Sequence, residues 1–211
     1  MFSQTDWAEI GRFEESNKAI ERGEKAIPKV VFIGNSITEG WPEKHPEFFE
    51  INNFAGRGIS GQTTYQLLVR FREDVINLHP EVVVINGGTN DIAENNYAYD
   101  EDRTFGNLVS MAELADANGI KVIMSGVLPA SSFYWHPHIN SIPEKQQSLN
   151  KRIKEYAESK GYGYVDYYTP LVGEGGALDP VYTSDGVHPN RRGYDIMEEA
   201  VMPMIESMMK R

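Results

Sequence analysis

The sequence of 211 residues contains no cysteine, which excludes a disulfide framework, a thiol nucleophile and a thiolate metal site. No apolar run approaches the roughly 18 residues that a membrane-spanning helix requires. Basic residues are also few, with 20 Lys and Arg against 31 Asp and Glu and a formal charge of −11. This charge repels nucleic acids and anionic membranes, so neither is an expected partner, and a small neutral or cationic substrate suits it better.

The length and the 40% hydrophobic content are typical of one globular domain, which we expect to cover residues 1–211. An N-terminal helix within residues 1–28 should pack on that domain. Acidic and basic residues occur throughout this segment, so no secretory leader is visible. We therefore expect a cytoplasmic protein for the chain as given, or a secreted or periplasmic one if a leader was removed. The oligomeric state is left open.

Apolar segments alternate along the chain with amphipathic ones. The former predict strands at residues 29–33, 51–55, 82–85, 121–127 and 164–166. The latter predict helices at residues 7–23, 63–78, 103–118, 143–159 and from 189 to the end. Strands that are apolar throughout, instead of alternating, are typical of a parallel sheet covered on both faces. The sequence thus predicts an α/β class protein with three α/β/α layers.

Four short groups of residues follow predicted strands: Gly34-Asn35-Ser36, Gly58-Ile59-Ser60-Gly61, Gly88-Thr89-Asn90-Asp91 and Asp185-Gly186-Val187-His188. Ligands of open parallel sheets bind beyond the carboxyl ends of the strands, where these groups should lie. Acyl transfer at a serine needs a nucleophile, a base, a group that orients the base, and donors for the developing oxyanion. Each group alone is weak, but the set in this order favours such a site.

Ser36 is the candidate nucleophile, because a sharp turn after the first strand could expose its hydroxyl. Alternatively, Asn35, Ser36 or Thr38 simply caps a helix. Asp185 and His188 lie three residues apart and project to one side of a turn. The carboxylate could therefore hold Nδ1 and leave Nε2 free for the serine proton. The alternative is an acid that stabilises a helix N-terminus beside an incidental histidine.

The candidate oxyanion donors are the backbone N–H groups of Ser36 and Gly61 and the side-chain amide of Asn90. A glycine lets its N–H approach a substrate oxygen without a side chain in the way, and an asparagine amide is a donor. Ordinary turn chemistry is the alternative for both residues, and for Gly58 it is the preferred interpretation.

The four groups resemble the conserved blocks of the SGNH hydrolases, also called the GDSL lipase/acylhydrolase superfamily, from residue 29 to the C-terminus. The resemblance implies a flavodoxin-like fold whose five parallel strands have the order 2-1-3-4-5. It also implies the family's four named residues and its triad acid: Ser36, Gly61, Asn90, His188 and Asp185. Asn35 stands where the family commonly has Asp. That Asp is not the proton-transfer partner, so the difference affects the match to the GDSL motif more than the expected chemistry. The surrounding sequence most resembles the platelet-activating-factor acetylhydrolase-like and carbohydrate O-acetylesterase branch.

The function expected from these residues and the resemblance is a serine esterase that works through an acyl-enzyme. It would remove small acyl groups, above all O-acetyl, from a carbohydrate or another small ester, without a cofactor or a metal. One alternative is a lysophospholipase or thioesterase type of acylhydrolase. Another is a non-catalytic flavodoxin-like module that holds a phosphate or nucleotide at helix N-termini.

Four residues are candidates for contact with the substrate: Asn35, Trp41, Tyr134 and Trp135. The aromatic rings could stack on a sugar or an acyl group, although each tryptophan could equally be packing in the core or a loop.

Two other patterns carry less weight. Residues 56–61 satisfy G-x-G-x-x-G, but they follow the second strand, and no acid ends the third strand to hold a ribose. His136 and His138 could bind zinc, but no H-E-x-x-H motif or carboxylate cluster accompanies them.

Overall fold

The computed structural model describes residues 6–210 and contains one five-stranded parallel sheet with the order β2-β1-β3-β4-β5. The predicted fold class and strand order are confirmed. The strands are β1 (Val30–Gly34), β2 (Phe54–Gly58), β3 (Val82–Ile85), β4 (Lys121–Ser125) and β5 (Gly163–Val165). β1 and β3 lie in the centre and consist of β-branched and aromatic residues, which fit a sheet buried on both faces.

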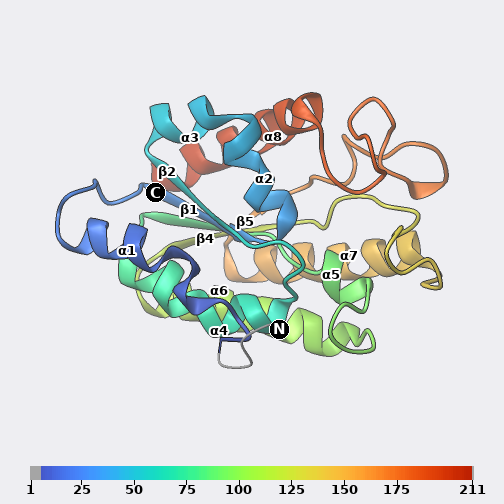
Figure 1. Cartoon of the computed structure of the whole chain (residues 1–211), viewed down its shortest axis with the longest axis horizontal. Coiled ribbons are helices and arrows are strands. Elements are labelled where there is room, and N and C mark those ends of the chain that lie inside the picture. The colour runs from blue at the N-terminus through green and yellow to red at the C-terminus, as the bar shows by residue number, and fades with distance from the viewer. Residues whose placement is uncertain (1–5, 211) are drawn as a thin grey trace.

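Helices cover both faces of the sheet, with α2, α3 and α8 on one face and α4, α6 and α7 on the other (Figure 1). The α-helices are α1 (Glu14–Glu21), α2 (Ser36–Lys44), α3 (Pro46–Asn52), α4 (Thr64–Asp74), α5 (Thr89–Ile92), α6 (Glu101–Ala117), α7 (Ile142–Lys160) and α8 (Arg191–Met209). Three 3-10 segments complete the elements: η1 (Ile10–Phe13), η2 (Ile76–Leu78) and η3 (Glu174–Gly176).

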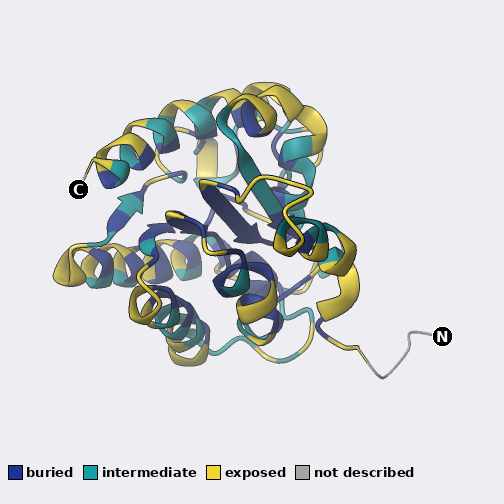
Figure 2. Ribbon diagram, turned by 90° about the vertical axis from the view of Figure 1, so that its left-hand side faces the viewer, coloured by how far each residue is buried: buried dark blue, intermediate teal, exposed yellow. Residues whose placement is uncertain are grey.

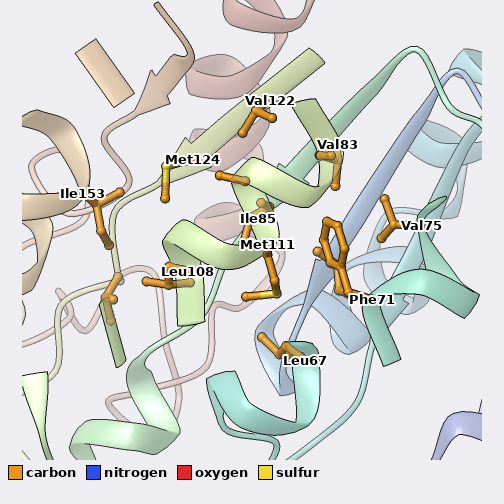
Figure 3. Packing of buried hydrophobic residues seen from close by; sticks show 14 of the residues in the cluster. Leu67, Phe71, Val75, Val83, Ile85, Leu108, Met111, Val122, Met124 and Ile153 are labelled. Atoms are coloured by element: carbon orange, nitrogen blue, oxygen red, sulfur yellow. The ribbon is translucent and has the colours of Figure 1, made fainter. Parts of the chain in front are cut away.

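The sheet separates two apolar cores, and its central strands are buried between the helical layers (Figure 2). Figure 3 shows part of the core under α4, α6 and α7, where Phe71, Met111 and Ile85 pack together. The opposite core is rich in aromatic rings that pack around Phe32 of β1. Both cores hold the central strands in place. Three of the predicted groups follow β1, β2 and β3, whereas the group at residues 185–188 follows no strand directly and lies in the loop before α8, which corrects the prediction for that group.

The segment between the first two strands differs from the prediction. Residues 51 and 52 end α3, and β2 begins only at Phe54. Ile51, whose apolar side chain suggested a strand, is 82% exposed. The capping alternative placed a helix start at residues 35–38, and α2 does begin there with Asn35 as its cap. No bounds were predicted for α2 or α3, where Pro42 and Pro46 interrupt the helical pattern. Pro46, however, occupies the first turn of α3, where proline is well tolerated.

The predicted N-terminal helix is shorter than expected. The Asp6 carboxylate accepts hydrogen bonds from the N–H groups of Ile10 and Gly11, as a capping residue does. The turn that follows is the 3-10 segment η1, however, and α1 begins only at Glu14. Asn17 of α1 donates to the buried Asp74 carboxylate at 2.9 Å, which joins this helix to the end of α4.

Within residues 6–210, no helix combines the length and the apolar character that crossing a membrane would require.

Candidate active site

Ser36 is the first residue of α2 and follows directly on β1. The preceding residue, Asn35, is 1% exposed, and its Oδ1 accepts from the Ile37 N–H at 3.0 Å. Asn35 is therefore a buried helix cap, which corrects the expectation that it contacts the substrate. The cap fixes the start of α2, so the Ser36 hydroxyl emerges at the carboxyl end of β1.

The three side chains predicted to form a triad lie within hydrogen-bond distance of one another, although Ser36 and His188 are 152 residues apart. Ser36 Oγ is 2.8 Å from His188 Nε2, and His188 Nδ1 is 2.7 Å from Asp185 Oδ2. A carboxylate only accepts, so Nδ1 carries the proton, and Nε2 is left to accept from the serine hydroxyl. This arrangement can withdraw the hydroxyl proton as the serine attacks a carbonyl carbon.

Residues 183–188, which we call the acid–base loop, hold this pair through local contacts. Asp185 Oδ1 accepts from the N–H groups of Val187 and His188 at 2.9 and 2.8 Å. The Thr183 hydroxyl donates to the His188 carbonyl at 2.8 Å. Burial by itself raises the pKa of Asp185, but the hydrogen bonds from the His188 backbone and ring and from the Val187 N–H lower this pKa to about 2. The carboxylate is therefore ionised at neutral pH.

Helix α8, which follows the acid–base loop, is tied to α2, which carries the serine. The Tyr194 hydroxyl donates to the Ile37 carbonyl at 2.7 Å, and the indole of Trp41 donates to Glu198 at 2.9 Å. These contacts bring the C-terminal part of the chain to the end of β1, and they account for the meeting of Ser36 and His188.

Ser36, Gly61 and Asn90 line one cleft, and we call them the strand-end side of the site. Gly61 adopts φ +77°, a conformation that favours glycine. Among residues 6–210, neither Ser36 N–H nor Gly61 N–H donates to a protein acceptor. Asn90 Nδ2 donates to the Gln62 carbonyl at 2.9 Å, which leaves its second hydrogen for another acceptor. The three residues predicted to supply oxyanion donors thus line one cleft.

Asp91, next to Asn90, ties this side together. Its carboxylate is fully buried and accepts from the N–H and the hydroxyl of Thr64, at 3.0 and 2.6 Å, and from the Tyr97 hydroxyl at 2.5 Å. Burial raises the pKa of Asp91, and these hydrogen bonds oppose that rise. The loops after β2 and β3 are consequently fixed to each other, so Gly61 and Asn90 keep a constant separation.

Beneath the strand-end side lies a buried arginine that sequence reasoning did not identify. Arg70 is 0% exposed and pairs with Asp74 at 2.8 Å. Its guanidinium also donates to Gln62 Oε1 and to the carbonyls of Gly34 and Arg57, at 2.6, 2.9 and 2.9 Å. It therefore connects the ends of β1 and β2 with the loop that contains Gly61. The predicted helix contains two arginines, Arg70 and the exposed Arg72, and nothing in the sequence indicates which of them is buried.

Gly58 owes its presence to close packing instead of a turn. It ends β2, and a β-carbon there would overlap the backbone of Glu39 in α2. Only a glycine allows α2 to approach the sheet so closely.

The cleft has a volume of about 300 Å³ and is open to solvent. Its lining residues are Ser36, Ser60, Gly61, Asn90, Asn95, Tyr134, Trp135 and His188. Tyr134 is 67% exposed, and the Trp135 ring lies 6.5 Å from the His188 ring, so both predicted aromatic residues do reach the site. Ser60 and Asn95 were given no role from the sequence, although Ser60 belongs to the predicted group at residues 58–61 and Asn95 follows the group at residues 88–91.

Trp41, in contrast, does not reach the cleft. It is 2% exposed and stacks on Phe48 in the core between the sheet and α8, with ring centroids 5.5 Å apart. The expectation that Trp41 contacts the substrate is therefore corrected to a role in core packing. Composition alone could not distinguish the two, because a large aromatic side chain suits either place.

The two loop histidines also have local partners. His136 Nδ1 lies 2.5 Å from the Ala93 carbonyl, and its ring is 5.5 Å from that of His138. Across the described part of the chain, no three His, Cys, Asp or Glu side chains come together as a metal site would require.

The model of the GDSL-like lipase/acylhydrolase family matches residues 32–196. The chain belongs to this family. The resemblance noted from the sequence is thus confirmed, and this domain is a carboxylic ester hydrolase. A crystal structure of a GDSL-like lipase from Bacteroides thetaiotaomicron is 57% identical, with a TM-score of 0.91, and the match covers 95% of this chain and 98% of that one.

The chain also has more distant likenesses. An acetylxylan esterase from Geobacillus stearothermophilus shares the fold, at 19% identity and a TM-score of 0.66, over 84% of this chain and 94% of that one. A multidomain esterase of Ruminococcus flavefaciens is 26% identical over 77% of this chain. An N-acylneuraminate cytidylyltransferase of Escherichia coli is 23% identical over 86% of it. The chain spans only 20% and 41% of the lengths of these last two proteins.

Proposed function

We propose that the protein is a serine esterase that cleaves small acyl esters through an acyl-enzyme. Ser36 attacks the ester carbonyl while His188 Nε2 takes its proton, and His188 then returns that proton to the leaving alkoxide. Asp185 holds the imidazole in the required tautomer. Water, activated by the same histidine, then releases the acid. The observation that carries the proposal is the continuous hydrogen-bonded series from Ser36 Oγ through His188 to Asp185.

The oxyanion that forms in each step would be stabilised by the Ser36 and Gly61 N–H groups and the Asn90 amide. These donors are fixed before the substrate arrives, so little reorganisation is needed when the negative charge develops. The free N–H groups of Ser36 and Gly61 support this assignment, because a buried or crowded donor would already be paired.

Labelling by a fluorophosphonate probe tests the nucleophile directly. We expect mass spectrometry to locate the adduct on Ser36, and Ser36→Ala to lower kcat on an aryl acetate by roughly 10⁶-fold. Ser110→Ala, on the outer surface of α6, is the matched control and should react as the wild type does. A folded Ser36→Ala variant with wild-type activity would refute the mechanism. Absence of labelling, together with a thermal shift caused by a nucleotide, would favour a binding module instead.

We further propose that the physiological ester is an O-acetyl group on a carbohydrate. The support is a small, open cleft with two accessible aromatic residues, Tyr134 and Trp135, on which a sugar ring can stack. The structural neighbour from Geobacillus, which is an acetylxylan esterase, points the same way.

A series of nitrophenyl esters from C2 to C12, followed by acetylated oligosaccharides, tests this specificity. We expect the highest kcat/KM for acetate, and a lower KM for the acetylated sugar than for the aryl ester. A maximum at C8 or longer would favour a lysophospholipase or thioesterase type of acylhydrolase. Trp135→Ala should raise KM for the sugar ester more than for the aryl acetate.

A further inference from the structure

Asn95 lines the cleft but takes no part in the mechanism above. Its side chain joins two loops that are separate in the sequence. Nδ2 donates to the Gly61 carbonyl at 3.0 Å, and Oδ1 accepts from the indole Nε1 of Trp135 at 2.9 Å. The backbone N–H of Asn95 also donates to the carbonyl of Asn90 at 3.1 Å. One residue therefore contacts both loops that carry oxyanion donors, as well as the aromatic wall.

The two side-chain partners allow only one orientation of the amide. An indole N–H can only donate, and a backbone carbonyl can only accept. With Oδ1 directed at Trp135, Nδ2 necessarily faces Gly61. If the indole moves away, Oδ1 loses its partner and the amide is free to rotate away from the glycine. The position of Trp135 is thus linked to the support that Gly61 receives.

Gly61 depends on such support because it has no side chain and adopts a positive φ. The peptide groups on either side of its N–H are each tethered. The Ser60 N–H donates to Glu39 Oε2 at 3.0 Å, and the Gly61 carbonyl accepts from Asn95. The Gly61 N–H lies between these tethers, so its direction depends on both. Without the Asn95 tether, the peptide group that follows Gly61 would keep the hydrogen bond from the Gln62 N–H to the Ile59 carbonyl, which is long at 3.4 Å, and the direction of the Gly61 N–H would be less well fixed.

We propose that Asn95 is a positioning residue that couples the aromatic wall of the cleft, Tyr134 and Trp135, to the oxyanion donor Gly61. A substrate group that binds against Trp135 holds the indole in place, and the indole fixes the Asn95 amide. The amide in turn orients the Gly61 N–H. The inference rests on the proposed function. It explains how a leaving group that binds at the wall raises the rate of acyl transfer, and not only the affinity. A residue that merely stabilised the fold would have no such link to kcat.

Asn95→Ala tests the coupling. The donor would be displaced but not removed, so we expect kcat to fall about tenfold, less than the 10²–10³ for loss of a donor, while KM changes by less than about twofold. The rate of fluorophosphonate labelling should fall in parallel, because the tetrahedral adduct uses the same donor. Asn96→Ala is the matched control: the Asn96 amide binds Gln66 and touches neither Gly61 nor Trp135, so kcat should not change.

Trp135→Phe tests the other half of the proposal, because it removes the indole N–H and keeps an aromatic side chain. We expect kcat to fall about threefold in the wild-type background and not at all in the Asn95→Ala background. The effects should be non-additive because the two residues act through one contact. Additive effects would overturn the coupling. A wild-type kcat in either single variant would also overturn the coupling. If Asn95→Ala does not fold, Trp135→Phe alone still decides the question.

The proposed function and this inference can fail separately. If the wild-type protein is labelled at Ser36 and hydrolyses esters, while folded Asn95→Ala matches it in kcat, only the positioning role is refuted. If Ser36 is not labelled, both proposals fall together.

Discussion

The two sides of the cleft are built in different ways. The acid–base loop relies on hydrogen bonds between residues at most five positions apart, and its two reactive side chains are about a third exposed, at 34% and 30%. The strand-end side draws its residues from the ends of three strands. It is held by buried contacts such as those of Arg70, which connect residues up to 36 positions apart. The first side is held by local contacts near the surface, and the second is held by buried contacts between residues that are distant in the sequence.

This difference separates activity from stability. A change within the acid–base loop should impair the reaction and leave the fold intact, because few buried contacts depend on it. A change beneath the strand-end side should reduce both, since the same hydrogen bonds fix the donors and close the core. Substitutions on each side can break or sharpen this distinction.

Among the substitutions that test this distinction, Asp185→Asn should have the largest effect. The amide keeps the size of the carboxylate but no longer holds the imidazole in the productive tautomer, so kcat should fall on the order of 10⁴-fold. The melting temperature should stay within a few degrees of the wild type, because the contacts of this side chain are local. Steady-state kinetics and thermal unfolding of the same samples measure both. A collapse in stability would show that the loop is not independent of the core.

Arg70→Met, in contrast, should strongly reduce the stability of the protein. It leaves the fully buried Asp74 carboxylate without its cation, so the free energy of unfolding should fall by about 3–5 kcal/mol. We also expect a lower kcat, since Gln62 loses a hydrogen bond next to Gly61. Urea denaturation measures the change. The double variant Arg70→Met with Asp74→Leu is the control and should recover part of the lost stability. Wild-type stability of the single variant would contradict the assigned role.

Asp185 should also make a smaller contribution to the free energy of unfolding, and this contribution should be lost at acid pH. Its pKa of about 2 lies below the roughly 3.9 of an unfolded aspartate, so its stabilising effect is complete above about pH 4 and is lost as the pH falls through 2. Because the side chain is a third exposed, we expect only about 1 kcal/mol. Denaturation of the wild type and Asp185→Asn between pH 5 and 2 should show a stability difference that shrinks below pH 4. A constant difference would refute the shift.

Arg12→Ala should have the smallest effect. Arg12 pairs with Glu39 at 3.1 Å and is 52% exposed, so its loss should change the free energy of unfolding by at most about 1 kcal/mol. Glu39 also holds Ser60, which makes kcat the more informative readout. An unchanged kcat would show that Glu39 holds the loop without help from the N-terminal segment. A clear fall in kcat would show that the N-terminal segment also helps to hold the strand-end side in place.

Sequence reasoning succeeded where a single local signal governs the structure. The run Val82–Ile85 is apolar and β-branched, and it forms β3 within the predicted bounds. The sequence of β2, Phe54–Gly58, contains two glycines and an arginine, so the apolar Ile51 nearby drew the prediction to the wrong residues. Periodicity detects burial, and this edge strand is only half-buried.

The site divides in the same way. Ser36, Asp185 and His188 could be identified because their residue types and order follow the chemistry, and the structure brings them together. Arg70 and Asn95 could not, since each acquires its partners only when distant loops meet. Reactive groups can therefore be predicted from the sequence more readily than the residues that position them.

The tie between α8 and α2 bears on how the protein is made. A chain still growing on the ribosome contains the serine early, but its base is synthesised 152 residues later, and Tyr194 reaches Ile37 only after that. Under the proposed mechanism, a chain that stops before residue 188 lacks its base and should be inert toward esters. Hydrolysis should then begin only after the last helix has docked on α2.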